Sequence, residues 1–449
     1  MISRAMQRDP SSTGIYIHFP YCIQKCHYCD FYSVGLDQDT RLPDRATAVP
    51  AEYLAAFLES LKLELRDRLE PANMNGVRHG DRSARNESDP DHRGFRRFET
   101  INTIFFGGGT ASLMPPELIR EILEVLRGEF LFAANIEITL EGNPENFSAD
   151  YLTALHELGV TRVNVGLQSF REDLLDSMNR YYDPGRYDAV LENLRSSQIE
   201  QIGGDLIYGF PGQTAAEFYD DLERVLAARV NHLSVYSLTL ESNTAYAGHV
   251  RTGKMIAPGE ELQERIFQEL PEALAARGLT QYEVSNFSRP GYECRHNLRY
   301  WLYESYLGLG PGAHGFDGRY RYGNSRSVAN WQKNPAAAAL QRHNPLEELP
   351  LVYLRLCDTI DANVFREVLV QEGGHPERVV DRAEEIFAQW AAAGYGSWTN
   401  AREGASDSAQ ALEGDRGFRW DMNGLLQLDD RVFEMCDALE ATTQPQSRD

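Results

Sequence analysis

Short apolar, β-branched runs recur along the chain and predict β-strands. They are IYIHF at 15–19, INTIFF at 101–106, IEITL at 136–140, RVNVGL at 162–167, GGDLIYG at 203–209 and HLSVYSL at 232–238. Longer stretches between them carry apolar residues every three or four positions, as in 53–65, 115–130 and 215–228, which is typical of helices. This alternation predicts an α/β fold of parallel strands with crossover helices, either a β/α barrel or an open doubly wound sheet.

Two segments interrupt this pattern. Residues 71–97 are charged, rich in Asn, Asp, Gly and Arg, and nearly free of aliphatic side chains, so we expect a mobile surface insertion. Residues 400–416 have the same character and interrupt a C-terminal region that otherwise reads as mainly helical. Within that region, 417–439 predicts a strand, a turn at Asn423-Gly424 and a helix.

Composition and charge narrow the class of protein. The 449 residues are 42% apolar and 25% charged, as in globular proteins, and no apolar run is long enough to span a membrane. The net charge of -23 repels phosphate backbones, so nucleic acid is not an expected partner. The first ten residues carry no apolar signal segment, and we expect the chain in the cytoplasm.

Three of the six cysteines, Cys22, Cys26 and Cys29, follow the first predicted strand directly. Soft thiolates at this spacing suit zinc or an iron-sulfur cluster. A closed zinc site would need a fourth ligand, for which the local candidates are His27 and Asp30, whereas a four-iron cluster on three cysteines keeps one iron open to an outside molecule. Structural zinc, or three unrelated buried thiols, remains the alternative.

Polar residues and glycines also collect where the later strands end. Phe106 is followed by three glycines and Thr110, and the third, fourth and fifth strands end near Glu141, Gln168 and Asp205. Glycines let a backbone approach a ligand closely and offer N–H groups to it. Since ligands bind at the carboxyl ends of parallel strands, these residues predict a binding site, although each one alone could be a cap or a turn.

At the cysteine motif the sequence resembles the radical S-adenosylmethionine superfamily. That resemblance implies a partial (β/α)6 barrel holding a [4Fe-4S] cluster on Cys22, Cys26 and Cys29. It further implies that the amino and carboxylate groups of S-adenosylmethionine chelate the open iron, and that an electron donor reduces the cluster so that a 5'-deoxyadenosyl radical can form. The expected organisation is a tail at 1–14, the barrel and its extension at 15–330, and a small, mainly helical C-terminal domain at 340–449.

Further segments resemble the coproporphyrinogen-oxidase-like group of that superfamily. They are YIHFPYC, FGGGT, LEGNP, RVNVGLQSF, DLIYGFPGQT and QYEVSNFSRPGYECRHNLRYW, within residues 15–316. The resemblance implies S-adenosylmethionine contacts at Tyr16, Tyr28, Gly108, Gly109, Thr110, Glu141, Gln168, Arg180 and Asp205. This is chemically compatible, because a carboxylate can accept from the ammonium group of the ligand and an arginine fork can hold its carboxylate.

The sequence departs from the oxidases of this group in two features. The oxidases carry a fourth cysteine two residues after the third and a long N-terminal arm. In this chain Asp30 and Phe31 follow Cys29, and only fifteen residues precede Tyr16. The segment His296–Trp301 instead resembles the HNxxYW signature of heme chaperones in the same group, which bind heme and pass it to acceptor proteins. His296 is then the candidate heme ligand.

Several alternatives stay open. The HNLRYW segment could be a capped, aromatic-packed turn, and Cys294 beside it could be a buried small residue. The chain could still be an active coproporphyrinogen III oxidase, or a zinc-stabilised binding module. A heme chaperone implies heme, an acceptor that could be a respiratory protein, and possible homodimers. The string Gly310 to Gly315 fits a dinucleotide motif but carries a proline and no following helix, and its His314 is a lesser candidate for heme.

Overall fold

A computed structural model describes residues 8–36, 48–69, 95, 99–180, 183–338, 340–357, 360–370, 376–400 and 416–442. The expected insertion at 71–97, apart from residue 95, and residues 401–415 of the second irregular segment lie outside the described residues. The chain divides into two compact units. The sheet unit comprises Asp9–Leu270 and Ser305–Arg342, and the C-terminal unit comprises Pro271–Glu304 and the described residues from His343 onward, with Arg8.

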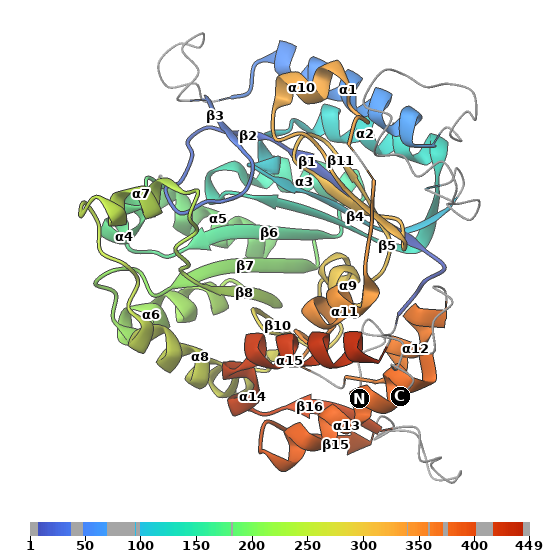
Figure 1. Cartoon of the computed structure of the whole chain (residues 1–449). Helices are drawn as coiled ribbons and strands as arrows, with labels where there is room; N and C mark the ends of the chain where they lie inside the picture. The colour runs from blue at the N-terminus through green and yellow to red at the C-terminus, as the bar shows by residue number, and fades with distance from the viewer. Residues whose placement is uncertain are drawn as a thin grey trace. The chain divides into compact units, whose positions relative to one another are not determined.

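All six predicted strands occur in the sheet unit and lie parallel to their neighbours (Figure 1). The strands are β1 Thr13–Phe19, β2 Tyr21–Cys22, β3 Val34–Gly35, β4 Thr100–Gly108, β5 Leu131–Gly142, β6 Arg162–Gln168, β7 Gln201–Tyr208, β8 His232–Ser237, β11 Tyr306–Leu309, β12 His314–Phe316, β13 Tyr320–Gly323 and β14 Gln341–Arg342. In this unit the main sheet has the order β14-β13-β12-β11-β1-β4-β5-β6-β7-β8, and β2 pairs with β3 separately. The α/β fold with a parallel sheet is confirmed.

Helices connect successive parallel strands: α1 Ala51–Leu69, α2 Pro116–Glu129, α3 Ala149–Glu157, α4 Glu172–Ser177, α5 Pro184–Ser196 and α6 Ala215–Leu226. α7 Ala245–Arg251 follows β8, α8 Glu260–Ala275 continues into the C-terminal unit, and α10 Val328–Lys333 lies between the antiparallel strands β13 and β14. Short 3-10 turns cover Ala111–Leu113 and Pro144–Asn146. In the described part of the chain, no helix is long and apolar enough to cross a membrane.

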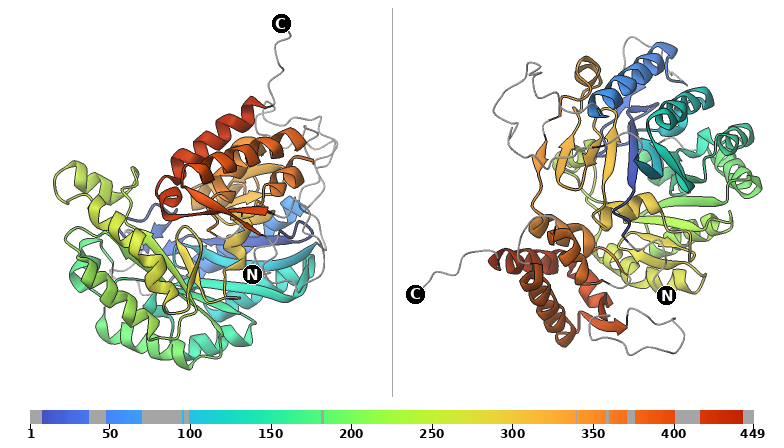
Figure 2. Two further views of the ribbon diagram at one scale, coloured as in Figure 1. Left: turned by 90° about the horizontal axis from the view of Figure 1, so that it is seen from below. Right: turned by 90° about the vertical axis from the view of Figure 1, so that its right-hand side faces the viewer.

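The two faces of the parallel sheet differ in polarity. Alternate residues such as Ile15, Ile138 and Val163 are fully or almost fully buried, and helices of the sheet unit cover the outer side of the strands (Figure 2). The residues between them on the same strands are polar, as Tyr16 and Glu137 illustrate. Because successive side chains of a strand point to opposite faces, this alternation places an apolar face against the helices and a polar face inside.

The glycine-rich string from Gly310 joins two antiparallel strands, β11 and β12. Gly310 and Gly312 have φ angles of +98° and +82°, a left-handed conformation that favours glycine. The segment leads into β12 and no helix begins there, so it is a loop and not a dinucleotide-binding turn.

The C-terminal unit is mainly helical, as expected. Its helices are α9 Arg295–Trp301, α11 Pro345–Tyr353, α12 Asn363–Val370, α13 Pro376–Ala392, α14 Met422–Leu426 and α15 Leu428–Ala441. Its strands form two antiparallel pairs: β9 Thr280–Glu283 with β10 Asn286–Ser288, and β15 Gly396–Asn400 with β16 Arg416–Trp420. The turn predicted at Asn423-Gly424 is wrong. Both residues lie in α14, because the Asp421 side chain caps that helix by accepting from the Gly424 N–H.

The division of the chain differs from the sequence-based boundaries over residues 271–304. The expectation assigned them to the barrel and its extension, whereas in the structure they group with the residues from His343 onward. This stretch contains the HNLRYW segment, which forms α9. The candidate cluster residues and the candidate heme ligand therefore belong to different units.

Candidate functional site

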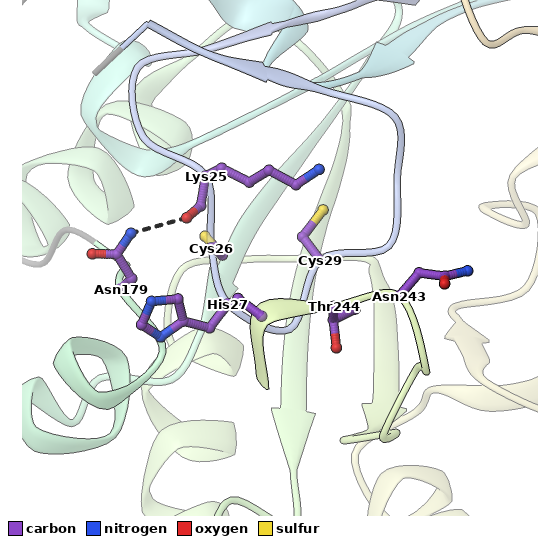
Figure 3. Close-up of a pocket in the computed structure, with 8 residues that line it drawn as sticks. Lys25, Cys26, His27, Cys29, Asn179, Asn243 and Thr244 are labelled. Carbon is purple, nitrogen blue, oxygen red and sulfur yellow. Dashed lines mark hydrogen bonds between the residues drawn. The ribbon is translucent and has the colours of Figure 1, made fainter. Parts of the chain in front are cut away.

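Cys22 ends the short strand β2, which follows β1 at its carboxyl end, and Cys26 and Cys29 lie on the loop after it. Backbone bonds from both sides hold this loop: the His27 N–H donates to the Met178 carbonyl (2.8 Å), and the Tyr246 N–H donates to the His27 carbonyl (2.9 Å). The Asn179 amide donates to the Lys25 carbonyl (2.9 Å; Figure 3). The loop conformation is thus fixed by the segments after α4 and at the start of α7.

The thiols interact with one another and with one cation. Burial, followed by the charge of Cys26, raises the pKa of Cys29 to about 11, and burial also raises the pKa of Cys22. The Arg180 Nη1 lies 3.7 Å from the Cys26 Sγ, and the Thr110 hydroxyl donates to the Cys22 Sγ (3.4 Å). The Thr110 hydrogen bond and the Arg180 charge oppose the effect of burial and lower the pKa of Cys22.

His27 and Asp30 are the two local candidates for a fourth zinc ligand. His27 turns its ring toward Asn179 and not toward Cys29 (Figure 3), and its Nδ1 lies 3.3 Å from the Ser177 carbonyl. Asp30 is exposed. Among the described residues, no three Cys, His, Asp or Glu side chains converge on one metal position. Cys22, Cys26 and Cys29 are part of this result, so it applies equally to a zinc site and to an iron-sulfur cluster.

Two carboxylates with raised pKa values face the interior at the carboxyl ends of β5 and β7. Burial, followed by the charge of Asp205, raises the pKa of Glu141 to about 8. Burial raises the pKa of Asp205 to about 6, against the opposing effects of a Ser234 hydrogen bond and the Arg180 charge. Like charges in a partly enclosed space destabilise each other's ionised form, and a bound cation would relieve this repulsion.

Arg180 is the cation nearest to both the thiols and the carboxylates. It is buried at 9% exposure, and its Nη2 donates to the Asn143 amide oxygen (3.2 Å) and to the Gly166 carbonyl. Its Nε is buried and has no hydrogen-bond partner within the described structure. An unsatisfied buried donor of a guanidinium group fits an anionic ligand such as a carboxylate.

The glycine turn after β4 lies against both the cysteine loop and the carboxylates. A Cβ on Gly107 would lie 2.8 Å from the Glu141 Oε2, and a Cβ on Gly109 would lie 2.7 Å from the Tyr21 carbonyl oxygen. The N–H groups of Gly109 and Thr110 donate to the Phe19 and Tyr21 carbonyls (2.7 and 2.9 Å). These two N–H groups therefore hold the strand that leads into the cysteines, and are not offered to a ligand as the sequence suggested.

The remaining expected contacts also lie in the sheet unit. The Tyr16 hydroxyl lies 3.1 Å from the His18 Nδ1, and Gly108 has a φ of +108° with no space for a Cβ beside the His18 ring. Tyr28 packs against an apolar cluster that includes Met178. Gln168 ends β6 with a φ of +67°.

His18 belongs to this region but was missed by the sequence reasoning. It is 3% exposed, its Nε2 lies 2.7 Å from the Tyr32 carbonyl, and burial lowers its pKa to about 4. Because only an N–H can bond that carbonyl, the neutral ring carries its proton on Nε2, and the Tyr16 hydroxyl donates to Nδ1. The available signal was periodicity, since His18 follows Tyr16 by two residues on the polar face of β1.

His296 lies in the C-terminal unit, on α9. It is fully buried, its Nε2 lies 2.9 Å from the Tyr300 hydroxyl, and burial lowers its pKa well below the usual value. Cys294 is buried at the helix N-cap, and Trp301 stacks under the Arg355 guanidinium. For His296 to bind iron through Nε2, the Tyr300 hydrogen bond must break and the site must open.

Comparison with known proteins agrees with this geometry. The Radical SAM superfamily model matches residues 93–225, which begin after the cysteine loop. A solved structure of coproporphyrinogen III oxidase (HemN) from Escherichia coli superposes with a TM-score of 0.69 over 97% of this chain and 92% of that chain, at 19% identity, which shows a shared fold. The family-model match and the shared fold thus define a radical S-adenosylmethionine-type protein.

Sequence relatives identify the branch. The chain is 32% identical to the heme chaperone HemW of Mycobacterium tuberculosis over 327 residues, which are 73% of this chain and 75% of that protein. It is 29% identical to HemW of Escherichia coli over 381 residues, or 80% and 90% of the two chains. The chain belongs to the HemW family of heme chaperones.

Proposed function

We propose that this protein binds heme and transfers it to acceptor proteins, and that it carries a [4Fe-4S] cluster with exchangeable S-adenosylmethionine. The observation that carries the proposal is the similarity to heme chaperones over about three quarters of the chain. An electron donor to the cluster, a respiratory acceptor, a homodimer and a cytoplasmic location are further parts of this hypothesis.

Cys22, Cys26 and Cys29 would hold the cluster. When bound, the cluster and S-adenosylmethionine would supply one-electron chemistry at the open iron. The nearby charge supports this assignment, because Arg180 lies against the Cys26 sulfur and compensates part of the negative charge of the thiolates.

The chain's own residues around that position would orient S-adenosylmethionine. Glu141 would accept from the ammonium group, which removes the penalty that Asp205 imposes on its ionised form. The unpartnered Nε of Arg180 would donate to the ligand carboxylate. Asp205, within β7, would accept from ribose hydroxyls.

His296 is the proposed heme ligand, and because it is buried, heme binding there requires a structural change. A fully buried imidazole paired with Tyr300 binds heme only if α9 and its surroundings rearrange. A neutral imidazole is the form that coordinates iron, and its lowered pKa keeps it neutral at physiological pH.

An anaerobic heme titration of the cluster-loaded protein, followed at the Soret band, tests the proposal. We expect saturation near one heme per chain in the parent and at least tenfold weaker binding in His296→Ala. His343→Ala is the matched control, because His343 is also buried in the C-terminal unit and also bonds a tyrosine hydroxyl, that of Tyr303. Its heme affinity should equal that of the parent.

Each other outcome has a defined meaning. Equal weakening in both variants would show loss of packing, and would remove His296 as the ligand. Absence of saturable heme binding in the parent would overturn the chaperone proposal, and turnover of coproporphyrinogen III would then establish the oxidase. A colourless, air-protected sample that contains zinc and no iron would establish the zinc-stabilised module.

A further inference from the structure

Asn179 binds two consecutive residues of the cysteine loop with its side chain. Its Nδ2 donates to the Lys25 carbonyl (2.9 Å; Figure 3), and its Oδ1 accepts from the Gln24 Nε2 (2.5 Å). Both partners lie between Cys22 and Cys26 in the chain. One side chain after α4 therefore holds the part of the loop that separates two of the candidate cluster ligands.

Asn179 also ends helix α4 in a left-handed turn. Its φ is +55°, its N–H donates to the Asp176 carbonyl (3.0 Å), and the Arg180 N–H donates to the Leu175 carbonyl (3.0 Å). These two bonds form a Schellman motif, in which the left-handed position is usually a glycine because a Cβ is disfavoured there. A glycine would complete this turn without strain, so the turn itself does not need an asparagine. The side chain adds the two bonds to the cysteine loop.

Arg180 follows Asn179 directly and is the buried cation of the candidate site. Its Nη1 lies 3.7 Å from the Cys26 Sγ, and its Nη2 donates to the Asn143 amide oxygen (3.2 Å). Its Nε, which has no hydrogen-bond partner within the described structure, is the proposed donor to the S-adenosylmethionine carboxylate. The turn at Asn179 therefore fixes the loop backbone and the guanidinium group together.

A cavity of about 190 Å³ lies beside these contacts (Figure 3). Asn179, Cys26 and Cys29 are among the residues that line it. Protein interiors are otherwise closely packed, so open space at this point allows the loop to move when the bonds that hold it are lost. Cys26 and Cys29 would then move with the loop.

We propose that Asn179 is a positioning residue for S-adenosylmethionine, because it holds the cysteine loop and Arg180 in the single arrangement that places the cluster thiolates beside the partner of the ligand carboxylate. This inference rests on the proposed function of the cluster and S-adenosylmethionine. Groups that are already fixed bind a ligand more tightly, since no ordering cost arises on binding. Asn179 acts through its neighbours and not by touching the ligand.

The test uses the cluster-loaded full chain without oxygen and has two readouts. Equilibrium dialysis gives the dissociation constant of S-adenosylmethionine, and a redox titration followed by electron paramagnetic resonance gives the midpoint potential of the cluster. In Asn179→Gly, which keeps the turn, we expect affinity for S-adenosylmethionine to fall about tenfold. The midpoint potential should become more negative, because the Arg180 guanidinium near Cys26 stabilises the reduced cluster and would move away.

Arg229→Gly is the matched control. Arg229 is another left-handed residue of the sheet unit that is not glycine (φ +61°), and it lies between α6 and the amino end of β8. Both readouts should keep their parent values in this variant. Gln24→Ala removes one of the two bonds to Asn179 without changing the turn, and should weaken S-adenosylmethionine binding about threefold. The double variant should bind as Asn179→Gly does, because both substitutions remove the same bond.

The remaining outcomes overturn the proposal or transfer the decision to a second variant. A parent value of either readout in Asn179→Gly, equal losses in Arg229→Gly, or additive losses in the double variant overturns it. A lower melting temperature with unchanged affinity for S-adenosylmethionine overturns it as well, since the role would then be structural alone. If Asn179→Gly does not load a cluster, Gln24→Ala decides: weaker binding supports the proposal, and unchanged binding overturns it.

The same measurements separate this inference from the proposed function. A parent that binds S-adenosylmethionine but no heme overturns the chaperone, while the results for Asn179→Gly and Gln24→Ala still support or overturn the positioning role. A parent that holds zinc in place of iron, or has no affinity for S-adenosylmethionine, overturns both.

Discussion

The polar inner face of the sheet carries charged residues at two levels, the amino layer and the carboxyl layer. The amino layer contains opposite charges, and the carboxyl layer contains two carboxylates of like charge. Near the amino ends of the strands, Arg162 and Glu137 form an ion pair of 3.4 Å in which both side chains are almost fully buried. Near the carboxyl ends, Glu141 and Asp205 carry the same sign of charge, and the charge of Asp205 adds to burial in raising the pKa of Glu141. Both layers are polar and enclosed, yet among the described residues only the first contains an ion pair.

The amino layer is typical of residues that stabilise the fold, and the carboxyl layer is typical of residues that bind a ligand. Opposite charges that satisfy each other stabilise a particular arrangement of strands, provided neither partner is removed. Like charges in an enclosed space are costly, and such a cost is typical of sites that a ligand completes. Arg180 already acts on Asp205 in the carboxyl layer, and the ammonium of S-adenosylmethionine is the further cationic group that the family membership suggests.

The largest predicted change in the free energy of unfolding follows from removing the ion pair of the amino layer. Arg162→Ala should lower the free energy of unfolding by about 3–5 kcal/mol, because it leaves Glu137 as a buried charge without its partner. Urea unfolding followed by circular dichroism measures this change. The control is Arg224→Ala, which breaks an exposed pair with Asp188 and should cost less than about 1 kcal/mol. Equal costs would show that the layers do not differ as described.

A substitution in the carboxyl layer should raise the free energy of unfolding, by a smaller amount than the loss expected in the amino layer. Glu141→Gln should raise the free energy of unfolding of the ligand-free protein by about 1–3 kcal/mol at pH 8, since one pKa unit corresponds to about 1.4 kcal/mol and partial exposure reduces the gain. The same variant should bind S-adenosylmethionine at least tenfold more weakly in equilibrium dialysis. A destabilised variant would mean that Glu141 has a structural role like that of Glu137.

The pH dependence of stability tests whether the pKa of Glu141 in the carboxyl layer is raised. Glu141 has a folded pKa of about 8 against an ordinary value of 4.5, so the native state binds more protons than the unfolded state between these values. Stability should therefore fall as pH rises through this window, by about 1 kcal/mol between pH 6.5 and 8. Subtracting the profile of Glu141→Gln isolates this contribution. Parallel profiles would contradict the raised pKa.

A further change in stability is expected from Gly107→Ala. The added Cβ would lie 2.8 Å from the Glu141 carboxylate oxygen, 3.0 Å from the Phe105 ring and 3.2 Å from the Tyr16 ring, so the free energy of unfolding should fall by about 1 kcal/mol. Binding of S-adenosylmethionine should also weaken, because the displaced carboxylate no longer meets the ammonium group. Dialysis beside the Gly128→Ala control, a position with open space for a Cβ, distinguishes the two effects.

The sequence predicted the parallel strands well, because apolar periodicity is a local property. It could not predict contacts that depend on tertiary structure. The glycine turn shows this, since its N–H groups bond the carbonyls of Phe19 and Tyr21, about ninety residues away in the chain. His296 shows the same limit, because a motif does not reveal that its imidazole is fully buried against Tyr300.

The placement of β11 has a consequence for folding. β1 pairs with β4 on one side and with β11 on the other, and residues 271–304 of the C-terminal unit separate β11 from the preceding part of the sheet. During synthesis, β1 therefore exposes one row of backbone donors and acceptors until Tyr306–Leu309 have left the ribosome. A nascent chain paused near residue 270 has an open sheet edge, so a fragment ending there should aggregate and recruit chaperones that the complete chain does not need.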